Sequence, residues 1–263
     1  MQSSLLEITP LQAFEDNYIW LLHNPESAVC IAVDPGDETP VLDWLQACGG
    51  SLAGILITHH HYDHIGGVPE LLATFPDIPV FGPTKNRISG VNRPVREGER
   101  IEIPGLEAGF TVMELPGHTA GHLAYLTEQA LFCGDTLFAG GCGRVFDGTF
   151  EQLSASLRRI AALPPDTLIY CAHEYTLSNL GFAAWVEPDN EALQRRTREE
   201  QQKRERDAPT LPSRLDLELA TNPFLRTGEP GVIAAAERYV GRPLSGHSAV
   251  FTALRTWKDR DYD

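Results

Sequence analysis

Residues 57–67 read ITHHHYDHIGG and place four histidines and one aspartate within six positions, directly after an apolar run. If the backbone stays extended past that run, His59 and His61 point to one side and His60 to the other. Asp63 and His64 then follow from a turn. Two neutral imidazoles and a carboxylate–imidazole pair form a ligand set that suits Zn²⁺ or Fe. The stretch therefore predicts metal chemistry.

Four residues cannot complete two coordination spheres, so further ligands are expected elsewhere in the chain. Three candidates stand at the ends of later strand-like runs: His118 in ELPGHTAGH, Asp135 in LFCGDTLF and His173 in LIYCAHEY. Each lies where an apolar run meets Gly or Ala, the position at which a strand brings a side chain to the rim of a sheet. The resulting five histidines and two aspartates suit two metal ions that share one carboxylate.

Other histidines do not fit this pattern. His60 and His122 lie beside the candidate ligands but out of phase with them, which favours a supporting or surface role. His23 and His247 have no clustered partners, and such histidines are usually exposed or hydrogen-bonded.

The five cysteines are odd in number and widely spread, without a C-x-x-C pair, which favours reduced thiols in a cytosolic protein over a disulfide framework. Cys133 and Cys171 lie inside apolar runs next to candidate ligands, and small buried hydrophobic residues are the preferred interpretation over thiolate ligands. Asp34 in DPG fits two interpretations equally, a partner of the ligands or a turn-forming aspartate.

The elements that must position these ligands are short apolar runs bounded by Gly, Pro and Asp, as in β-strands. They read NYIWLLH, AVCIAVDPG, LAGILITHHH, IPVFGP, FTVMELPGH, HLAYLTEQALFCGDTLF and DTLIYCAHE. Helical patterns intervene over 38–49, 66–76 and 149–163, the last with Thr149 as N-cap and Gln152 at the capping-box position. Strands that alternate with helices predict α/β layers.

The sequence pattern changes after residue 175, and from there it predicts a mainly helical unit. Residues 189–207 hold six basic and six acidic side chains, so their local charge balances. Arg195 with Glu199 and Glu200 with Arg204 are spaced by four, which favours a solvated helix with ion pairs over a nucleic-acid-binding segment.

The last residues also have a helical pattern, with Val250, Leu254 and Trp257 on one apolar stripe. We therefore expect a catalytic domain over 1–175 and a smaller helical domain over 176–263.

The overall composition narrows the class of protein. The chain has 263 residues, a formal net charge of −15 and a pI near 5.0. Such a charge repels phosphate backbones, so we expect no nucleic-acid partner. The first residues show no signal-peptide pattern, and the apolar runs are too short for a membrane span. We expect a soluble, cytoplasmic protein that does not bind membranes.

The motifs together resemble a known family. H-x-H-x-D-H with downstream His, Asp and His is the signature of the metallo-β-lactamase superfamily. THHHYDHIGG, PGHTAGH, CGDTLFAGGCGR, CAHEYTLSNL, PTLPSRLDLELATNPFLR and RTWKD are similar, in order, to the glyoxalase II (hydroxyacylglutathione hydrolase) family over nearly the whole chain.

The resemblance implies an α/β fold, a four-layer αββα sandwich with a small helical C-terminal domain, and a dinuclear metal site. In that site His59, His61 and His118 would hold one metal, Asp63, His64 and His173 the other, and Asp135 would bridge them. Zn is the metal expected, with Fe and Mn as alternatives.

The resemblance further implies hydrolysis of S-D-lactoylglutathione to D-lactate and glutathione, in the detoxification of methylglyoxal. Two metals can supply a bridging hydroxide near neutral pH, with Asp63 and Asp135 as the carboxylates of the catalytic centre. The leaving thiolate has a conjugate acid with a pKa of about 8.5, so it departs without a general acid. Asp63 could instead accept a proton, but metal binding would keep it ionised.

By position in the family, five residues would bind glutathione. Arg255 and Lys258 match the basic pair for its glycine carboxylate, although an isolated R-x-x-K would be read as a solvated helix. Arg144 stands where relatives carry lysine, and Arg can bind a carboxylate through two hydrogen bonds. Phe146 stands where they carry tyrosine, so one hydroxyl is missing. Tyr175 matches a substrate contact.

A small-molecule thioester is thus the expected partner, and the chain is expected to act as a monomer. The alternatives are another hydrolase of the superfamily, such as a lactonase or β-lactamase, an iron-dependent persulfide dioxygenase, or a metal-binding fold without catalysis.

Overall fold

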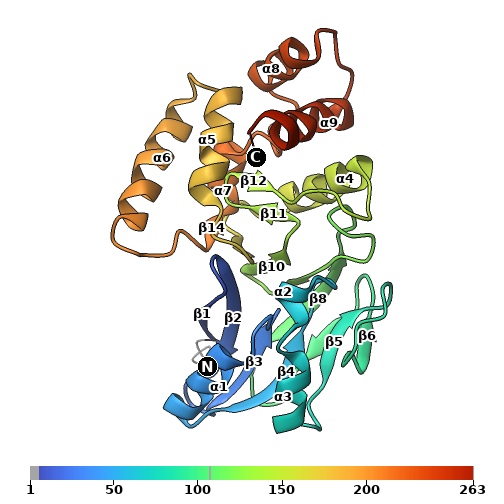
Figure 1. Cartoon of the computed structure of the whole chain (residues 1–263), viewed down its shortest axis with the longest axis vertical. Coiled ribbons are helices and arrows are strands. Elements are labelled where there is room, and N and C mark those ends of the chain that lie inside the picture. Colours follow the sequence, from blue (N-terminus) through green and yellow to red (C-terminus); the bar gives the residue numbers. More distant parts are fainter. Residues whose placement is uncertain (1–5, 107, 263) are drawn as a thin grey trace. The chain divides into compact units, whose positions relative to one another are not determined.

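The structure, a computed structural model, describes residues 6–106 and 108–262 (Figure 1). The chain divides into two compact units. The first unit comprises residues 1–114 and 121–134, and the second comprises 115–120 and 135–263. The domains expected from the sequence, 1–175 and 176–263, stay a prediction.

The first unit is built on a mixed sheet with the strand order β1-β2-β3-β4-β5-β6. β1 to β3 pair antiparallel, and β3 to β6 pair parallel. The strands are β1 (Glu7–Ala13), β2 (Asn17–His23), β3 (Val29–Val33), β4 (Ser51–Leu56), β5 (Val80–Pro83) and β6 (Arg93–Val95). Parallel strands bring their carboxyl ends to one edge, so the segments after β3 and β4 become neighbours.

A second group of strands in the first unit pairs antiparallel in the order β7-β8-β9-β10. These strands are β7 (Arg100–Glu102), β8 (Gly109–Glu114), β9 (Leu123–Leu126) and β10 (Ala130–Gly134). The residues of β10 are fully buried, which explains why its sequence shows no polar alternation.

The helices of the first unit are α1 (Thr39–Cys48), α2 (Tyr62–Ile65) and α3 (Val68–Thr74). α1 and α3 pack on the mixed sheet: Val41 and Leu45 of α1 and Val68 and Leu71 of α3 share a buried core with Ile55 of β4. α2 is a single helical turn that follows the histidine stretch. It carries two of the candidate ligands, Asp63 and His64.

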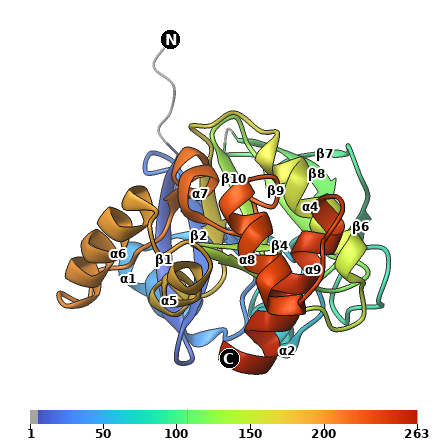
Figure 2. The same cartoon turned by 90° about the horizontal axis from the view of Figure 1, so that it is seen from above.

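The second unit begins with the short hairpin β11 (Leu137–Phe138) and β12 (Gly141–Cys142) and is otherwise mainly helical. Its other elements are α4 (Phe150–Ala161), β13 (Leu168–Cys171), α5 (Thr176–Val186), α6 (Glu191–Arg204), β14 (Ser213–Arg214), α7 (Leu215–Thr221), α8 (Pro230–Val240), α9 (His247–Trp257) and a π-helical turn (Lys258–Tyr262). β13 and β14 pair antiparallel. Figures 1 and 2 both show α5 beside α6 and α8 beside α9.

Local signals read from the sequence explain where several elements begin. The expected capping box of α4 is confirmed: the Thr149 hydroxyl accepts from the Gln152 amide, and the Gln152 side chain accepts from the Thr149 N–H. The C-terminal segment is helical as expected, with Val250 and Leu254 buried. Within the described residues, none of the helices combines the length and apolarity that a membrane crossing needs.

The helix with ion pairs expected over 189–207 is present as α6, but it is not solvated on all sides. The side chain of Arg196 on α6 is 1% exposed and donates to Glu218 Oε1 at 2.5 Å, and Glu218 is itself 0% exposed. The neighbouring Arg195 is 60% exposed and lies 3.8 Å from Glu191, one turn earlier. Charge balance alone cannot tell which face of a helix another helix will cover.

The burial of Arg196 and the exposure of Arg195 can be tested by mutation. We expect Arg196→Ala to lower the free energy of unfolding by about 3 kcal/mol or more, because it leaves the buried Glu218 carboxylate uncompensated. Arg195→Ala, the matched exposed control, should change it by less than about 0.5 kcal/mol. Urea unfolding of both variants measures the difference, and equal losses would contradict the assignment of a buried ion pair.

Candidate metal centre

A buried aspartate orients the candidate ligands of the first unit. Asp34 directly follows β3, and Thr58 and His59 follow the neighbouring parallel strand β4. Asp34 Oδ1 accepts from the Thr58 N–H and Oδ2 from the Thr58 hydroxyl, both at 2.7 Å. The backbone of Asp34 has a φ of 53°, so this residue also forms the turn. Both interpretations of Asp34 drawn from the sequence therefore hold.

The same carboxylate orients His64. The Nδ1–H of His64 donates to Asp34 Oδ2 at 2.9 Å, which places Nε2 as the atom that can bind a metal. A partner of this kind on the far nitrogen is typical of metal-binding histidines. Ligand-type atoms of Asp34, His59 and His64 lie within 4.8 Å of one another. Because Asp34 already accepts three hydrogen bonds, we assign it to orienting the ligands.

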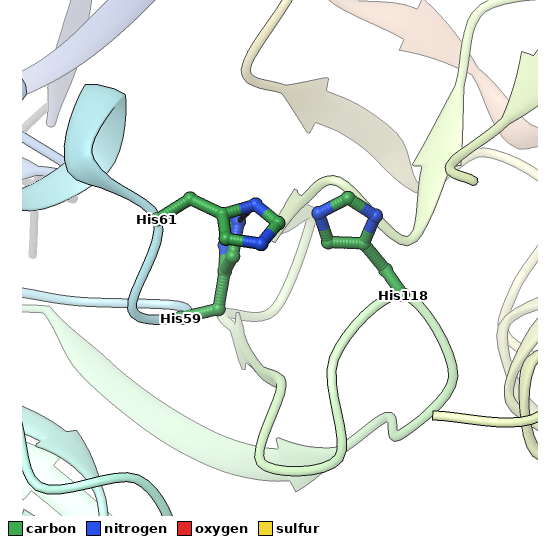
Figure 3. Close-up of side chains that lie close together, drawn as sticks. All are labelled: His59, His61 and His118. Atoms are coloured by element: carbon green, nitrogen blue, oxygen red, sulfur yellow. Dashed lines mark hydrogen bonds between the residues drawn. The ribbon is translucent and has the colours of Figure 1, made fainter. Parts of the chain in front are cut away.

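His59 and His61 present a pair of ring nitrogens. His59 Nδ1 lies 3.0 Å from the Thr58 hydroxyl, and His59 Nε2 lies 3.1 Å from His61 Nδ1. Figure 3 shows these two imidazoles close together above the loop that carries both, and His118 at the bend of its own loop. Since Thr58 donates its proton to Asp34, its oxygen accepts from His59, and Nε2 of His59 keeps the lone pair.

Asp63 and His64 form a second pair of donor atoms in the first unit, with Asp63 Oδ2 at 3.5 Å from His64 Nε2. Asn17, at the start of β2, donates to the same Asp63 oxygen at 3.0 Å. Asn17 does not stand out in the sequence, because it lies 46 residues from Asp63 and outside any motif.

The loop after β3 and the histidine loop approach each other through glycines. A Cβ atom added to Gly36 would lie 1.9 Å from the Asp63 carbonyl oxygen, and one added to Gly66 would lie 2.5 Å from the Gly36 oxygen. Larger residues would push the two loops apart and with them Asp34 and its hydrogen-bond partners.

In the second unit, two further candidate ligands converge on the carboxylate of a third. Asp135 Oδ2 lies 3.5 Å from His118 Nε2 and 3.4 Å from His173 Nε2. His118 Nδ1 donates to the Arg144 carbonyl at 2.7 Å, which again presents Nε2. All three candidate ligands are buried.

These separations fit a metal. Bonds of about 2.1 Å in a tetrahedral site put neighbouring donor atoms about 3.4 Å apart. The donor pairs His59–His61, Asp63–His64, His118–Asp135 and His173–Asp135 span 3.1 to 3.5 Å. Histidine and aspartate clusters of this geometry suit divalent metal ions.

The histidines excluded from the ligand set have other contacts. His60 Nδ1 lies 2.9 Å from Asn86 Nδ2. His122 is buried and stacks on His59, with ring centroids 4.7 Å apart. Cys133 and Cys171 are buried thiols, as the apolar runs around them predict.

Two candidate substrate residues contact the candidate ligands of the second unit. Tyr175 stacks on His173 with ring centroids 4.7 Å apart and an interplanar angle of 4°. Phe146 is exposed and meets the His118 ring edge-on at 5.2 Å. These aromatic contacts restrict the rotation of both imidazoles.

Arg255 and Lys258 are buried, so the interpretation of two charges on a solvated helix is wrong. Arg255 Nη2 and Nε lie 2.8 and 3.1 Å from Asp259 Oδ1, and Nη1 donates to the Cys142 carbonyl at 3.0 Å. The exposed Arg144 also approaches Asp259, with Nε at 3.7 Å from Oδ1. Asp259 of the RTWKD motif thus contacts Arg255 and Arg144, two of the three cations that are expected to bind glutathione.

The thiols of two cysteines are held in their neutral form by burial. Burial raises the pKa of Cys30 to about 12. Burial also raises the pKa of Cys142 to about 11, although the guanidinium of Arg255 lies 3.9 Å from its sulfur and opposes the shift.

Comparison with known proteins agrees with this geometry. A family model described as the metallo-beta-lactamase superfamily matches residues 30–173, and one described as the hydroxyacylglutathione hydrolase C-terminus matches residues 174–261. A hydroxyacylglutathione hydrolase from Alkalilimnicola ehrlichii is 54% identical over 97% of this chain and all of its own length. One from Ectopseudomonas mendocina is 53% identical over the same shares.

A crystal structure of a metallo-beta-lactamase from Staphylococcus aureus superposes with a TM-score of 0.63 at 17% identity, covering 97% of this chain and 72% of that one. This likeness concerns the fold alone. Together with the two family matches it confirms the expected fold class, the metallo-β-lactamase fold with a helical C-terminal part.

The hydrogen bonds of Asp34 predict a measurable effect on metal binding. We expect Asp34→Asn to weaken metal affinity about 10- to 100-fold, because His64 and Thr58 lose the carboxylate that orients them. Asp37→Asn in the same loop is the control, since Asp37 caps only the Thr39 N–H. Competition with a chelating dye measures both affinities, and an unchanged affinity in Asp34→Asn would contradict the assigned role.

Proposed function

We propose the activity of this chain from one premise, that it belongs to the hydroxyacylglutathione hydrolase family within the metallo-β-lactamase superfamily. The chain is a dinuclear-metal thioester hydrolase that converts S-D-lactoylglutathione to D-lactate and glutathione. The observation that carries this proposal is the spacing of its histidine and aspartate donor atoms, which suits metal ions without any rearrangement within either unit.

The proposed ligand sets follow from which donor atoms lie side by side. One metal is held by His59, His61 and His118, the other by Asp63, His64 and His173, and Asp135 bridges them. The position of Asp135 Oδ2 between His118 and His173 supports its bridging role, since each of these histidines belongs to a different set. The hydrogen bonds on the far nitrogens of His59, His64 and His118 support the same assignment.

Two divalent metal ions, when bound, lower the pKa of water toward neutrality and polarise a carbonyl group. Asp63 and Asp135 bring the negative charge that such ions need, and Asn17 fixes the direction of the Asp63 carboxylate. The leaving glutathione thiolate has a conjugate acid with a pKa of about 8.5, so it departs without a proton donor from the chain.

Glutathione carries two carboxylates, and the chain provides cations for them in spite of its net charge of −15. Arg144, Arg255 and Lys258 take this role in the proposal, with Asp259 holding two of the guanidinium groups in place. Tyr175 borders the same end of the substrate. Phe146 lacks the hydroxyl of the family tyrosine, so it contributes contact area and no hydrogen bond.

Finer features of the proposal remain predictions from the sequence. Zn²⁺ is the expected metal, although the same donor atoms accept Fe and Mn²⁺ and availability often decides between them. The enzyme is expected to act as a monomer in the cytoplasm, where its cysteines stay reduced.

The proposed activity predicts about two metal ions per chain and rapid hydrolysis of S-D-lactoylglutathione. Removal of the metals with a chelator should abolish turnover, and addition of Zn²⁺, Fe²⁺ or Mn²⁺ should restore it. Elemental analysis and release of free thiol measure the two quantities.

Absence of turnover by the metal-loaded protein would reject the proposed function. The same protein is then tested with lactones and β-lactams, and with glutathione persulfide at an oxygen electrode, because these assays separate the alternative activities.

The glutathione-binding role predicts an effect on KM alone. Arg144→Ala and Lys258→Ala should each raise KM for S-D-lactoylglutathione about tenfold, because a charge-assisted hydrogen bond is lost, while metal content stays unchanged. Arg255 is a poorer choice, since its side chain also holds the Cys142 carbonyl. Arg260→Ala, an exposed cation of the same π-helical turn, is the control. Steady-state kinetics measure KM. If KM is the same in all variants, the glutathione-binding role of Arg144 and Lys258 is rejected.

A further inference from the structure

The hairpin β11–β12 connects two parts of the proposed metal centre. Asp135 precedes it, and Arg144, whose carbonyl accepts from His118 Nδ1, follows it. Leu137 pairs with Cys142, and a turn at Ala139–Gly140 joins the strands. A hairpin with two residues in each strand has too few ladder hydrogen bonds to fix its own position.

Buried side chains supply the missing hydrogen bonds at the turn. Asn179 of α5 donates to the Ala139 carbonyl at 3.1 Å. Glu218 of α7 accepts from the Gly140 N–H at 2.9 Å. Asn222, directly after α7, donates to the Gly141 carbonyl at 2.9 Å and lies 3.3 Å from that of Phe138. Four consecutive residues of the hairpin are therefore held by side chains from the helical part. We call Asn179, Glu218 and Asn222 the hairpin clamp.

The clamp is itself fixed. Glu218 Oε1 accepts from Arg196 and from the Ser213 hydroxyl, and Oε2 accepts from Asn222 at 3.0 Å. All three clamp residues are at most 3% exposed. Hydrogen bonds among fully buried groups are costly to break, because the separated groups cannot form hydrogen bonds to water instead.

Close packing leaves the hairpin no room to shift. A Cβ atom added to Gly141 would lie 2.4 Å from Asn179 Cγ, and one added to Gly140 would lie 2.9 Å from Leu180 Cδ2. Gly140 also has a φ of 70°, a conformation that side chains other than glycine rarely adopt.

The fixed turn determines where the ends of the hairpin lie. The Gly143 N–H donates to the Thr136 carbonyl at 3.3 Å, and a Cβ atom at Gly143 would lie 2.0 Å from the Asp135 carbonyl oxygen. The backbone of Asp135 is thus in contact with the residue before Arg144. Any movement of the hairpin changes both the Asp135 carboxylate and the carbonyl that orients His118.

We propose that Asn179, Glu218 and Asn222 are positioning residues of the metal centre, which hold the bridging ligand Asp135 and the ligand His118 in place through the β11–β12 hairpin. This inference rests on the proposed function insofar as Asp135 and His118 bind metal. It gives the LDLELATNPF segment, which contains Glu218 and Asn222, a role in the chemistry although it contributes no ligand.

The test compares metal affinity with folding stability. Asn179→Ala and Asn222→Ala are purified as the full chain, and the affinity for Zn²⁺ is measured by competition with a chelating dye. We expect about tenfold weaker binding of at least one ion in each variant and an altered absorption spectrum of the Co²⁺-loaded protein, with KM for S-D-lactoylglutathione within about twofold of the original. Glu218 is not mutated, because its loss would leave the buried Arg196 without a carboxylate partner.

Asn190→Ala is the matched control, since Asn190 also donates to a backbone carbonyl of the second unit, that of Ala220 at 3.0 Å, and caps α6. It should lower the melting temperature of the metal-free protein without changing Zn²⁺ affinity or the Co²⁺ spectrum. The proposal is overturned if both clamp variants bind Zn²⁺ like the original chain, or if Asn190→Ala weakens binding equally. If the original chain binds metal but cleaves no thioester, the proposed function fails, whereas the affinity comparison still decides the role of the clamp.

Discussion

The buried carboxylate of Asp34 is the group on which the orientation of the first unit's candidate ligands depends. A buried carboxylate is stable only when donors surround it, and here the N–H and hydroxyl of Thr58 and the ring of His64 supply them. The same bonds place a proton on Nδ1 of His59 and of His64, so that Nε2 is the ring nitrogen that faces away from Asp34. One buried charge therefore sets the chemical form of two ligands, and the parallel pairing of β3 and β4 is what brings it beside them.

The second unit orients its ligands by a different means. His118 is held by a backbone carbonyl, that of Arg144, so its direction depends on the course of the chain over 135–144. The buried pair Arg196–Glu218 and the asparagines around it fix that course. A buried ion pair adds little net stability, because the cost of removing both charges from water offsets their attraction.

The candidate ligands could be selected from the sequence, whereas the residues that support them could not. His59, His61 and Asp63 stand out because close spacing after an apolar run has no simple structural explanation, and strand ends mark the distant ligands. Asn17 could not be predicted in this way, since it meets Asp63 only through the fold. The burial of Arg196 was missed for a related reason: helix periodicity shows two faces, and a charged face carries no sign that another helix will cover it.

The burial of Cys142 has a consequence for a protein proposed to bind thioesters. Acyl groups move readily from a thioester to a thiolate, so a reactive cysteine near such a substrate would become acylated. Because burial raises the pKa of the Cys142 thiol to about 11, the neutral thiol is favoured near pH 7. The burial of this sulfur thus opposes its acylation by a bound thioester, and it does so beside the Arg255 guanidinium, which favours the thiolate.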